Sequence, residues 1–187
     1  ELFFASETFI AATATDENGN TSEFSNSAAL IVNDARDLPD ADPNDNLLDI
    51  DLVMPGLQVS LRAAIVAADV NPNRDLIYFD IPTESAEPPM ILVGETPLPV
   101  ITHPVLIDGS TQPIAGQVHV RGGVRGSDEH GFNMTSADVT LRGLKITGFG
   151  GDGVRSTHTK LDFENVDLSE GPHLSAVEIA FNGGWGV

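Results

Sequence analysis

Closely spaced acidic side chains between residues 33 and 51 are the part of this sequence best suited to chemistry. Seven aspartates fall in this stretch, and Pro39 and Pro43 exclude a regular helix or a central strand there. A calcium ion binds roughly six to eight oxygen ligands, which closely spaced carboxylates and amides can supply. Five residues lie at or beside the positions of a calcium-binding loop: Asp40, Asp42, Asn44, Asp49 and Asp51.

This calcium pattern departs from an EF-hand at two places. Asp45 occupies the sixth position, where an EF-hand loop has glycine, and Pro43 restricts the turn. The stretch therefore resembles the calcium loops of extracellular repeats more than an EF-hand. It predicts a structural calcium ion as cofactor, and the alternative is an acidic turn in contact with solvent.

Histidines and paired carboxylates are weaker candidates. No two histidines have a spacing that would place them on one face with a carboxylate, which indicates surface or turn positions rather than metal ligands. Asp152 with Asp162, or Glu164 with Asp167, could form the carboxylate pair of a glycoside hydrolase. The glycines on either side of Asp152 are more simply explained by a turn. The five histidines are His103, His119, His130, His158 and His173.

Basic residues in the second half could serve a polysaccharide lyase, which needs a base beside a uronate carboxylate. Arg121 and Arg142 occupy equivalent positions of a sequence repeat and predict an outward-facing ladder. A serine nucleophile elbow, a phosphate-cradling loop and a dinucleotide fingerprint are all missing. The sequence therefore predicts no catalytic residue. The basic candidates are Arg121, Arg125, Arg142, Lys145, Arg155 and Lys160.

Composition favours a strand-rich protein that binds neither nucleic acid nor membranes. The 187 residues are 41% hydrophobic and only 6% aromatic, with 18 glycines and 12 prolines, a balance typical of short strands and many turns. The formal charge of −19 repels a phosphate backbone and an anionic membrane surface. Without cysteine or a stretch of about 20 apolar residues, we expect no disulfide, membrane insertion or signal peptide here.

Local patterns predict a hairpin, then one helix, then strands. Asn18-Gly19 is typical of a hairpin turn and lies within residues 9–32. Ser60 can cap a helix over residues 60–69 whose apolar positions 61, 64, 65 and 68 share one face, and Asn71-Pro72 ends it. The first strands predicted after it are residues 76–81, 90–93 and 105–109.

The second half contains a repeat of about 22 residues, within the range of solenoid repeats. Residues 118–123 resemble residues 139–144 at an offset of 21, and later segments match at offsets of 22 and 23. Short strands separated by turns at this period describe one coil of a solenoid, which is unstable without its neighbours. The spaced leucines of a leucine-rich repeat are missing. We therefore expect an all-β fold, a right-handed parallel β-helix.

Residues 37–43, 60–65, 71–72 and 77–82 together resemble the CSLREA module, named for the motif Cys-Ser-Leu-Arg-Glu-Ala. Ser60-Leu61-Arg62-Ala63-Ala64 stands here where that motif has Ser-Leu-Arg-Glu-Ala. Such modules cap the start of a right-handed parallel β-helix in large exported proteins of bacteria and archaea, and residues 107–113 resemble its first coil. The resemblance covers roughly residues 31–187 and implies an extracellular, secreted or cell-surface location.

The resemblance also has departures and an implication for the ends of the chain. Val59 and Leu48 stand where the module has cysteines, which implies that an apolar pair packs in place of a disulfide. Residues 13–25 resemble the segment that closes such modules. The chain is therefore expected to span the junction between two modules, with coils that continue beyond it.

Three segments and one leading function are predicted. Residues 1–32 are a β-hairpin that ends a preceding module, residues 33–82 a cap of acidic loop and helix, and residues 83–187 the coils. The expected function is a non-enzymatic structural or adhesion module. The alternatives are a carbohydrate-active β-helix and a filament or surface-layer subunit joined by strand donation. Expected partners are other modules or copies, through strand edges and coil ends, and glycans.

Overall fold

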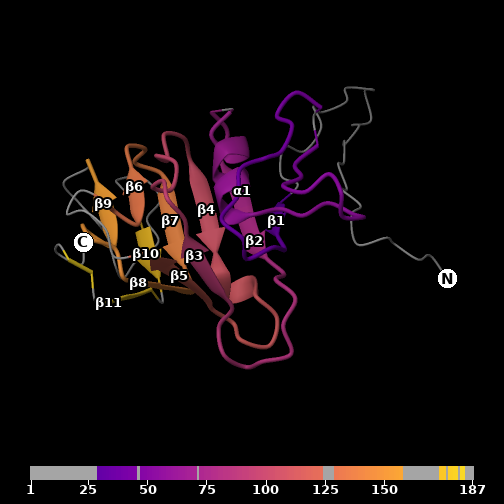
Figure 1. Ribbon diagram of the computed structural model, residues 1–187. Coiled ribbons are helices and arrows are strands. Elements are labelled where there is room, and N and C mark those ends of the chain that lie inside the picture. The colour runs from indigo at the N-terminus through magenta and orange to yellow at the C-terminus, as the bar shows by residue number, and fades with distance from the viewer. Residues whose placement is uncertain are drawn as a thin grey trace, which may run out of the picture.

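The computed structural model describes residues 29–183 except 46, 71, 124–128, 158–172, 176 and 181. Within these residues the chain forms one α-helix and eleven short strands (Figure 1). The elements are β1 (Leu30–Val32), α1 (Leu61–Ala68), β2 (Asp75–Phe79), β3 (Met90–Val93), β4 (Val105–Asp108), a 3₁₀ turn (Gly109–Thr111), β5 (Val118–Gly122), β6 (Phe132–Met134), β7 (Val139–Arg142), β8 (Leu144–Thr147), β9 (Val154–Ser156), β10 (His173–Ser175) and β11 (Glu178–Ala180).

The strands form three sheets, and every described pairing is parallel. The first sheet has the order β1-β2-β4-β7-β10, the second β11-β8-β5-β3, and the third pairs β6 with β9. The chain visits the three sheets in turn: β4, β5 and β6 lie in the first, second and third sheet, and β7, β8 and β9 repeat that order. Each circuit therefore adds one strand to each sheet (Figure 1).

These circuits do not share one length, as a fixed repeat of about 22 residues would require. The offset from Phe132 to its partner Val154 matches the predicted period. The offset from Val118 to Leu144 is longer, and that from Val105 to Val139 is longer still. The predicted repeat equates β5 with β7, which lie in different sheets, so this part of the prediction is wrong. Both strands contain buried apolar residues followed by Arg-Gly, so local similarity gave the wrong partner.

One continuous apolar core fills the space between the sheets. In the first sheet Ile77, Ile107 and Leu141 follow one another in register, and all three are fully buried. The second sheet contributes a matching inward row of Ile91, Val120 and Ile146. Because side chains alternate between the two faces of a strand, the intervening residues point outward.

The helix closes this core beside the first two strands. As predicted, Ser60 caps it, since its hydroxyl accepts the amide of Ala63 at 3.0 Å. Its buried face packs against the core on the side of β1 and β2 (Figure 1). That face includes the four predicted apolar residues, Leu61, Ala64, Ile65 and Ala68. The described helix is too short to cross a membrane.

The predicted N-terminal hairpin lies mostly outside the described residues. Its last residues, Leu30–Val32, form β1, which pairs in parallel with β2 through Leu30 and Ile77. The predicted boundary at residue 32 thus falls directly after a strand of the first sheet. Leu48 and Val59, the predicted apolar pair, both lie against the common core, Val59 as a buried member and Leu48 at its margin.

Candidate functional site

The acidic loop is irregular, as predicted, and its carboxylates mostly fold the loop itself. No helix or strand occurs between β1 and α1 in the residues that the structure describes. Asp40 and Asp42 each accept the amide of the residue two positions later, at 3.3 and 3.1 Å. Asp45 and Asp51 do the same at 2.8 and 3.2 Å. Such side-chain turns are the local structure that aspartate favours.

The five predicted calcium ligands have these and other partners. Asp49 is buried and accepts the amides of Asp51 and Gln58 at 3.0 and 3.2 Å. Asp51 also accepts a hydrogen bond from Arg36 at 3.0 Å. Among the described residues no three acidic or histidine side chains form a group that could hold an ion. The calcium site therefore stays a prediction, and these contacts show what an ion would have to displace.

Arg36 organises the base of the loop. Its guanidinium bonds to Asp34 at 2.8 Å and Asp51 at 3.0 Å, and it contacts the sulfur of Met54 at 3.7 Å. Hydrogen bonding to Arg36 is the main cause that holds the pKa of Asp34 and of Asp51 below the usual value. Both carboxylates are therefore charged at neutral pH.

A second arginine, Arg62, joins the loop to the helix and to the segment after β3. It forms a two-pronged ion pair with Asp37 at 2.8 and 2.9 Å, and it donates to the carbonyls of Thr96 and Pro97. Asp37 also accepts the amide of Gly94. The sequence did not predict this role of Arg62, although a charged residue within a helix as apolar as α1 indicates a buried partner.

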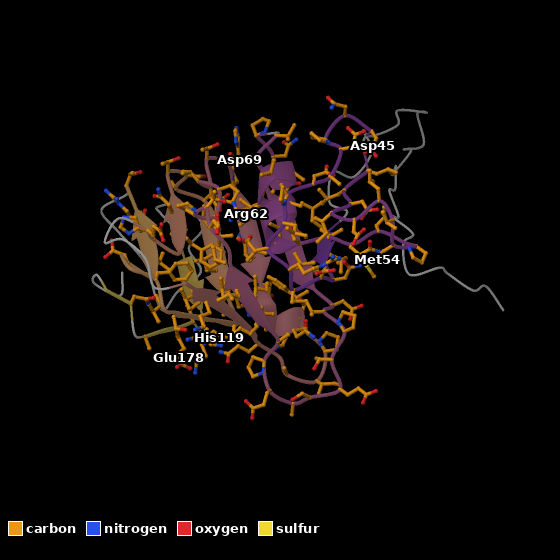
Figure 2. The ribbon with its side chains drawn as sticks, in the orientation of Figure 1. Asp45, Met54, Arg62, Asp69, His119 and Glu178 are labelled. Atoms are coloured by element: carbon orange, nitrogen blue, oxygen red, sulfur yellow. The ribbon has the colours of Figure 1, made fainter. Side chains whose placement is uncertain are left out.

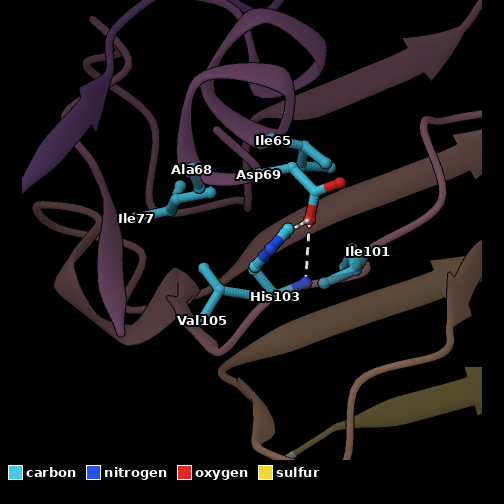
Figure 3. A pocket seen from close by; sticks show the side chains of 7 residues that line it. All are labelled: Ile65, Ala68, Asp69, Ile77, Ile101, His103 and Val105. Carbon is cyan, nitrogen blue, oxygen red and sulfur yellow. Dashed lines mark hydrogen bonds and ion pairs between the residues drawn. The ribbon is translucent and has the colours of Figure 1, made fainter. Parts of the chain in front are cut away.

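Beside the end of the helix, Asp69 fixes the segment that leads into β4. Its carboxylate accepts the amides of Thr102 and His103, both at 2.8 Å, and the Thr102 hydroxyl at 2.7 Å. Burial would raise the pKa of Asp69, but these hydrogen bonds outweigh it and lower the pKa. The adjoining depression of ≈ 170 Å³ is lined mainly by apolar side chains and leaves no space for a water molecule (Figure 3).

His130 and Asp152 form a contact that the sequence did not predict. Asp152 was a candidate for a carboxylate pair, but its proposed partner Asp162 lies outside the described residues. Its carboxylate is instead 3.2 Å from Nδ1 of His130. Nδ1 also faces the amide of Asp152 at 2.9 Å, and Nε2 faces the guanidinium of Arg155 at 2.7 Å. Both ring nitrogens therefore contact polar groups of neighbouring segments.

The outer face of the second sheet carries a small basic cluster. His119 on β5 lies in register with Lys145 on β8, and its imidazole contacts the Thr147 hydroxyl at 2.8 Å. Lys145 pairs with Glu178 on β11 at 3.0 Å. Burial, then Lys145 and Arg121, lower the pKa of His119, so the imidazole is mostly neutral at pH 7. Figure 2 shows His119 and Glu178 on this side of the molecule.

Arg121 is an exposed cation on the described part of this face, and the predicted ladder with Arg142 is wrong. Arg121 lies on β5 in register with Thr147, whereas Arg142 lies on β7 in the first sheet and pairs with Asp108 at 3.6 Å. Within the described part of the chain, Arg121 has no hydrogen-bond or ion-pair partner. The other candidate bases Arg125 and Lys160 lie outside the described residues.

No protein-family model, curated protein or solved structure matches this chain.

Proposed function

We propose that the three sheets form a right-handed parallel β-helix, capped at its start by the acidic loop and α1. The order in which the chain visits the sheets, the parallel pairing and the single core all support it. The right-handed sense follows from the strong preference for right-handed crossovers between parallel strands. The Ser60-Leu61-Arg62 motif, which resembles the CSLREA module, also supports a cap at the start of the β-helix.

On this scaffold the protein acts as a non-enzymatic structural or adhesion module of an exported protein. The observation that carries this proposal is that the main polar side chains bond to the scaffold itself. Arg62 and Asp69 join separate segments of the chain, and both ring nitrogens of His130 contact neighbouring groups. Two depressions in the described part, of ≈ 170 and ≈ 220 Å³, leave little or no space for a water molecule. Export itself is proposed from the resemblance to the CSLREA module.

Proteolytic shaving of intact source cells tests the exported location. A protease added outside unbroken cells should release peptides of this chain, detected by mass spectrometry, while cytoplasmic marker proteins stay intact. Peptides that appear only after cell lysis would contradict the proposal. The control is a parallel sample of lysed cells, which shows that the peptides are detectable.

A carbohydrate-active β-helix is the second candidate, favoured by the His130 and Asp152 contact beside an open depression of ≈ 220 Å³. Incubation with uronate polysaccharides would then produce unsaturated or reducing ends, and His130→Ala would abolish them. For a scaffold module we expect no product from the wild-type protein. Product formation that survives His130→Ala would place an active site elsewhere.

A further inference from the structure

The acidic loop presents an apolar tip to solvent. Leu52, Val53 and Met54 are consecutive, and their exposed fractions are 59%, 93% and 49%. Single exposed apolar residues are common on protein surfaces, whereas a contiguous patch of exposed apolar residues marks an interaction site. The exposure of this tip therefore calls for a partner.

Polar contacts hold this tip in one shape. The Asp51 carboxylate accepts the amide of Val53 at 3.2 Å, and the Asp51 carbonyl accepts the amide of Met54 at 3.1 Å. Arg36 bonds to Asp51 and contacts the Met54 sulfur. A tip that is already ordered loses little conformational freedom when it binds, which favours docking.

A second surface of the chain complements the tip in polarity and charge. On the outer face of the second sheet, Met90 and Leu92 are 46% and 53% exposed, and Leu92 lies in register with Arg121. The loop carries seven aspartates against Arg36, and Arg62 neutralises one of them. The surface of the loop is thus apolar and acidic, whereas the outer face of the second sheet is apolar and basic. The two surfaces are therefore complementary.

Arg121 has no hydrogen-bond or ion-pair partner among the described residues, so it can make such a contact. The other described arginines and lysine all have a partner: Arg36, Arg62, Arg74, Arg142 and Lys145 contact carboxylates at 2.8 to 3.6 Å, and Arg155 contacts His130. In a chain with 28 acidic and 9 basic residues, an exposed arginine without a partner among the described residues is an exception. A carboxylate from another molecule would complete its contacts.

We propose that the tip Leu52–Met54 of one copy of this chain docks on the Met90, Leu92 and Arg121 surface of a second copy, so that copies join head to tail. Figure 2 shows Met54 at the right-hand edge of the molecule and His119, which is in register with Met90, well apart from it at the lower left. The contact therefore forms between molecules. Two different surfaces meet, so each added copy leaves one tip and one sheet surface free.

Sedimentation velocity of the 187-residue chain tests this contact from about 10 μM to about 1 mM, in about 0.15 M salt, where long-range repulsion is screened. The wild-type protein should sediment faster as its concentration rises. Val53→Asp and Arg121→Glu should each weaken assembly by at least about tenfold. Both side chains are exposed, so melting temperature and circular dichroism should match the wild type. Val70→Asp, at a residue 79% exposed elsewhere, is the control and should assemble normally.

An equimolar mixture of the two variants is the decisive sample. The Val53→Asp protein keeps an intact sheet surface and the Arg121→Glu protein an intact tip, so the mixture should form dimers and nothing larger. A wild-type protein that stays monomeric at about 1 mM would overturn the proposal. So would variants that assemble like the wild type, or a mixture that stays monomeric. None of these outcomes depends on export, which shaving of intact cells tests separately.

Discussion

Arg62 is buried among groups that bond to each of its guanidinium nitrogens, and it is the residue through which the cap is held together. It lies on α1, yet its partners come from the acidic loop and from the segment after β3. The exposed fractions of the Arg62 and Asp37 side chains are 11% and 3%. A buried pair of this kind contributes little when both partners are present, but loss of one partner leaves an uncompensated charge.

We therefore expect Arg62→Met to destabilise the protein by about 3–5 kcal/mol, because among the described residues Asp37 would keep only the Gly94 amide as a donor. The control is Arg36→Met, which breaks exposed ion pairs and should cost much less stability than Arg62→Met. Urea unfolding measures both. Equal losses in the two variants would contradict a central role for Arg62, and adding Asp37→Leu to Arg62→Met should recover part of the loss.

At the scale of single elements, the sequence predicted the helix and most strands but not their pairing. Ser60 and the apolar period of residues 61–68 are local signals, and local contacts decide a helix. Pairing depends on the lengths of the intervening loops, which local strand patterns do not encode. The same limit applies to the site, because sequence showed that the loop is acidic but not that Arg36 and Arg62 organise it.

Glycines held a signal for the correct pairing. Gly109 follows β4, and a side chain there would come within 2.3 Å of the carbonyl of Gly143, which follows β7. Gly122 and Gly148 meet in the same way at the ends of β5 and β8. Each glycine pair has the same offset along the chain as the two paired strands beside it. These two glycine pairs therefore mark, in the sequence itself, the strand register that a fixed period does not give.

Calcium binding is a property of the acidic loop as an element. If the loop binds calcium only when folded, about 2 mM Ca²⁺ should raise the melting temperature and excess chelator should lower it. Asp42→Ala removes a predicted ligand and should abolish the difference. Asp45→Ala is the matched variant, since it also removes one side-chain turn but is not a predicted ligand. No calcium effect in the wild type would leave the solvated acidic turn as the explanation. Equal loss of the effect in both variants would contradict a specific role of Asp42 as a ligand.

For the whole molecule, charge makes stability depend on pH in two opposing ways. At a formal net charge of −19 the carboxylates repel one another. Their partial protonation from neutral pH toward pH 5 relieves this repulsion and stabilises the folded state. The lowered pKa of His119 opposes this below about pH 6.5, because the folded state takes up that proton less readily than the unfolded chain. Asp34 and Asp69 act at lower pH, since their pKa values lie below that of an unfolded aspartate, about 3.9.

The acid limb of the stability curve should accordingly depend on Asp69. Its carboxylate is favoured in the folded state, so its contribution is fully present above about pH 4 and is lost as pH falls through its lowered folded pKa. Asp69→Asn keeps an acceptor for the amides of Thr102 and His103 but removes the titrating charge. Urea unfolding at a series of pH values should give a shallower fall for Asp69→Asn than for the wild type. The control is Asp80→Asn, at an exposed carboxylate, which should follow the wild-type curve. Identical slopes for Asp69→Asn and the wild type would show that Asp69 does not govern acid unfolding.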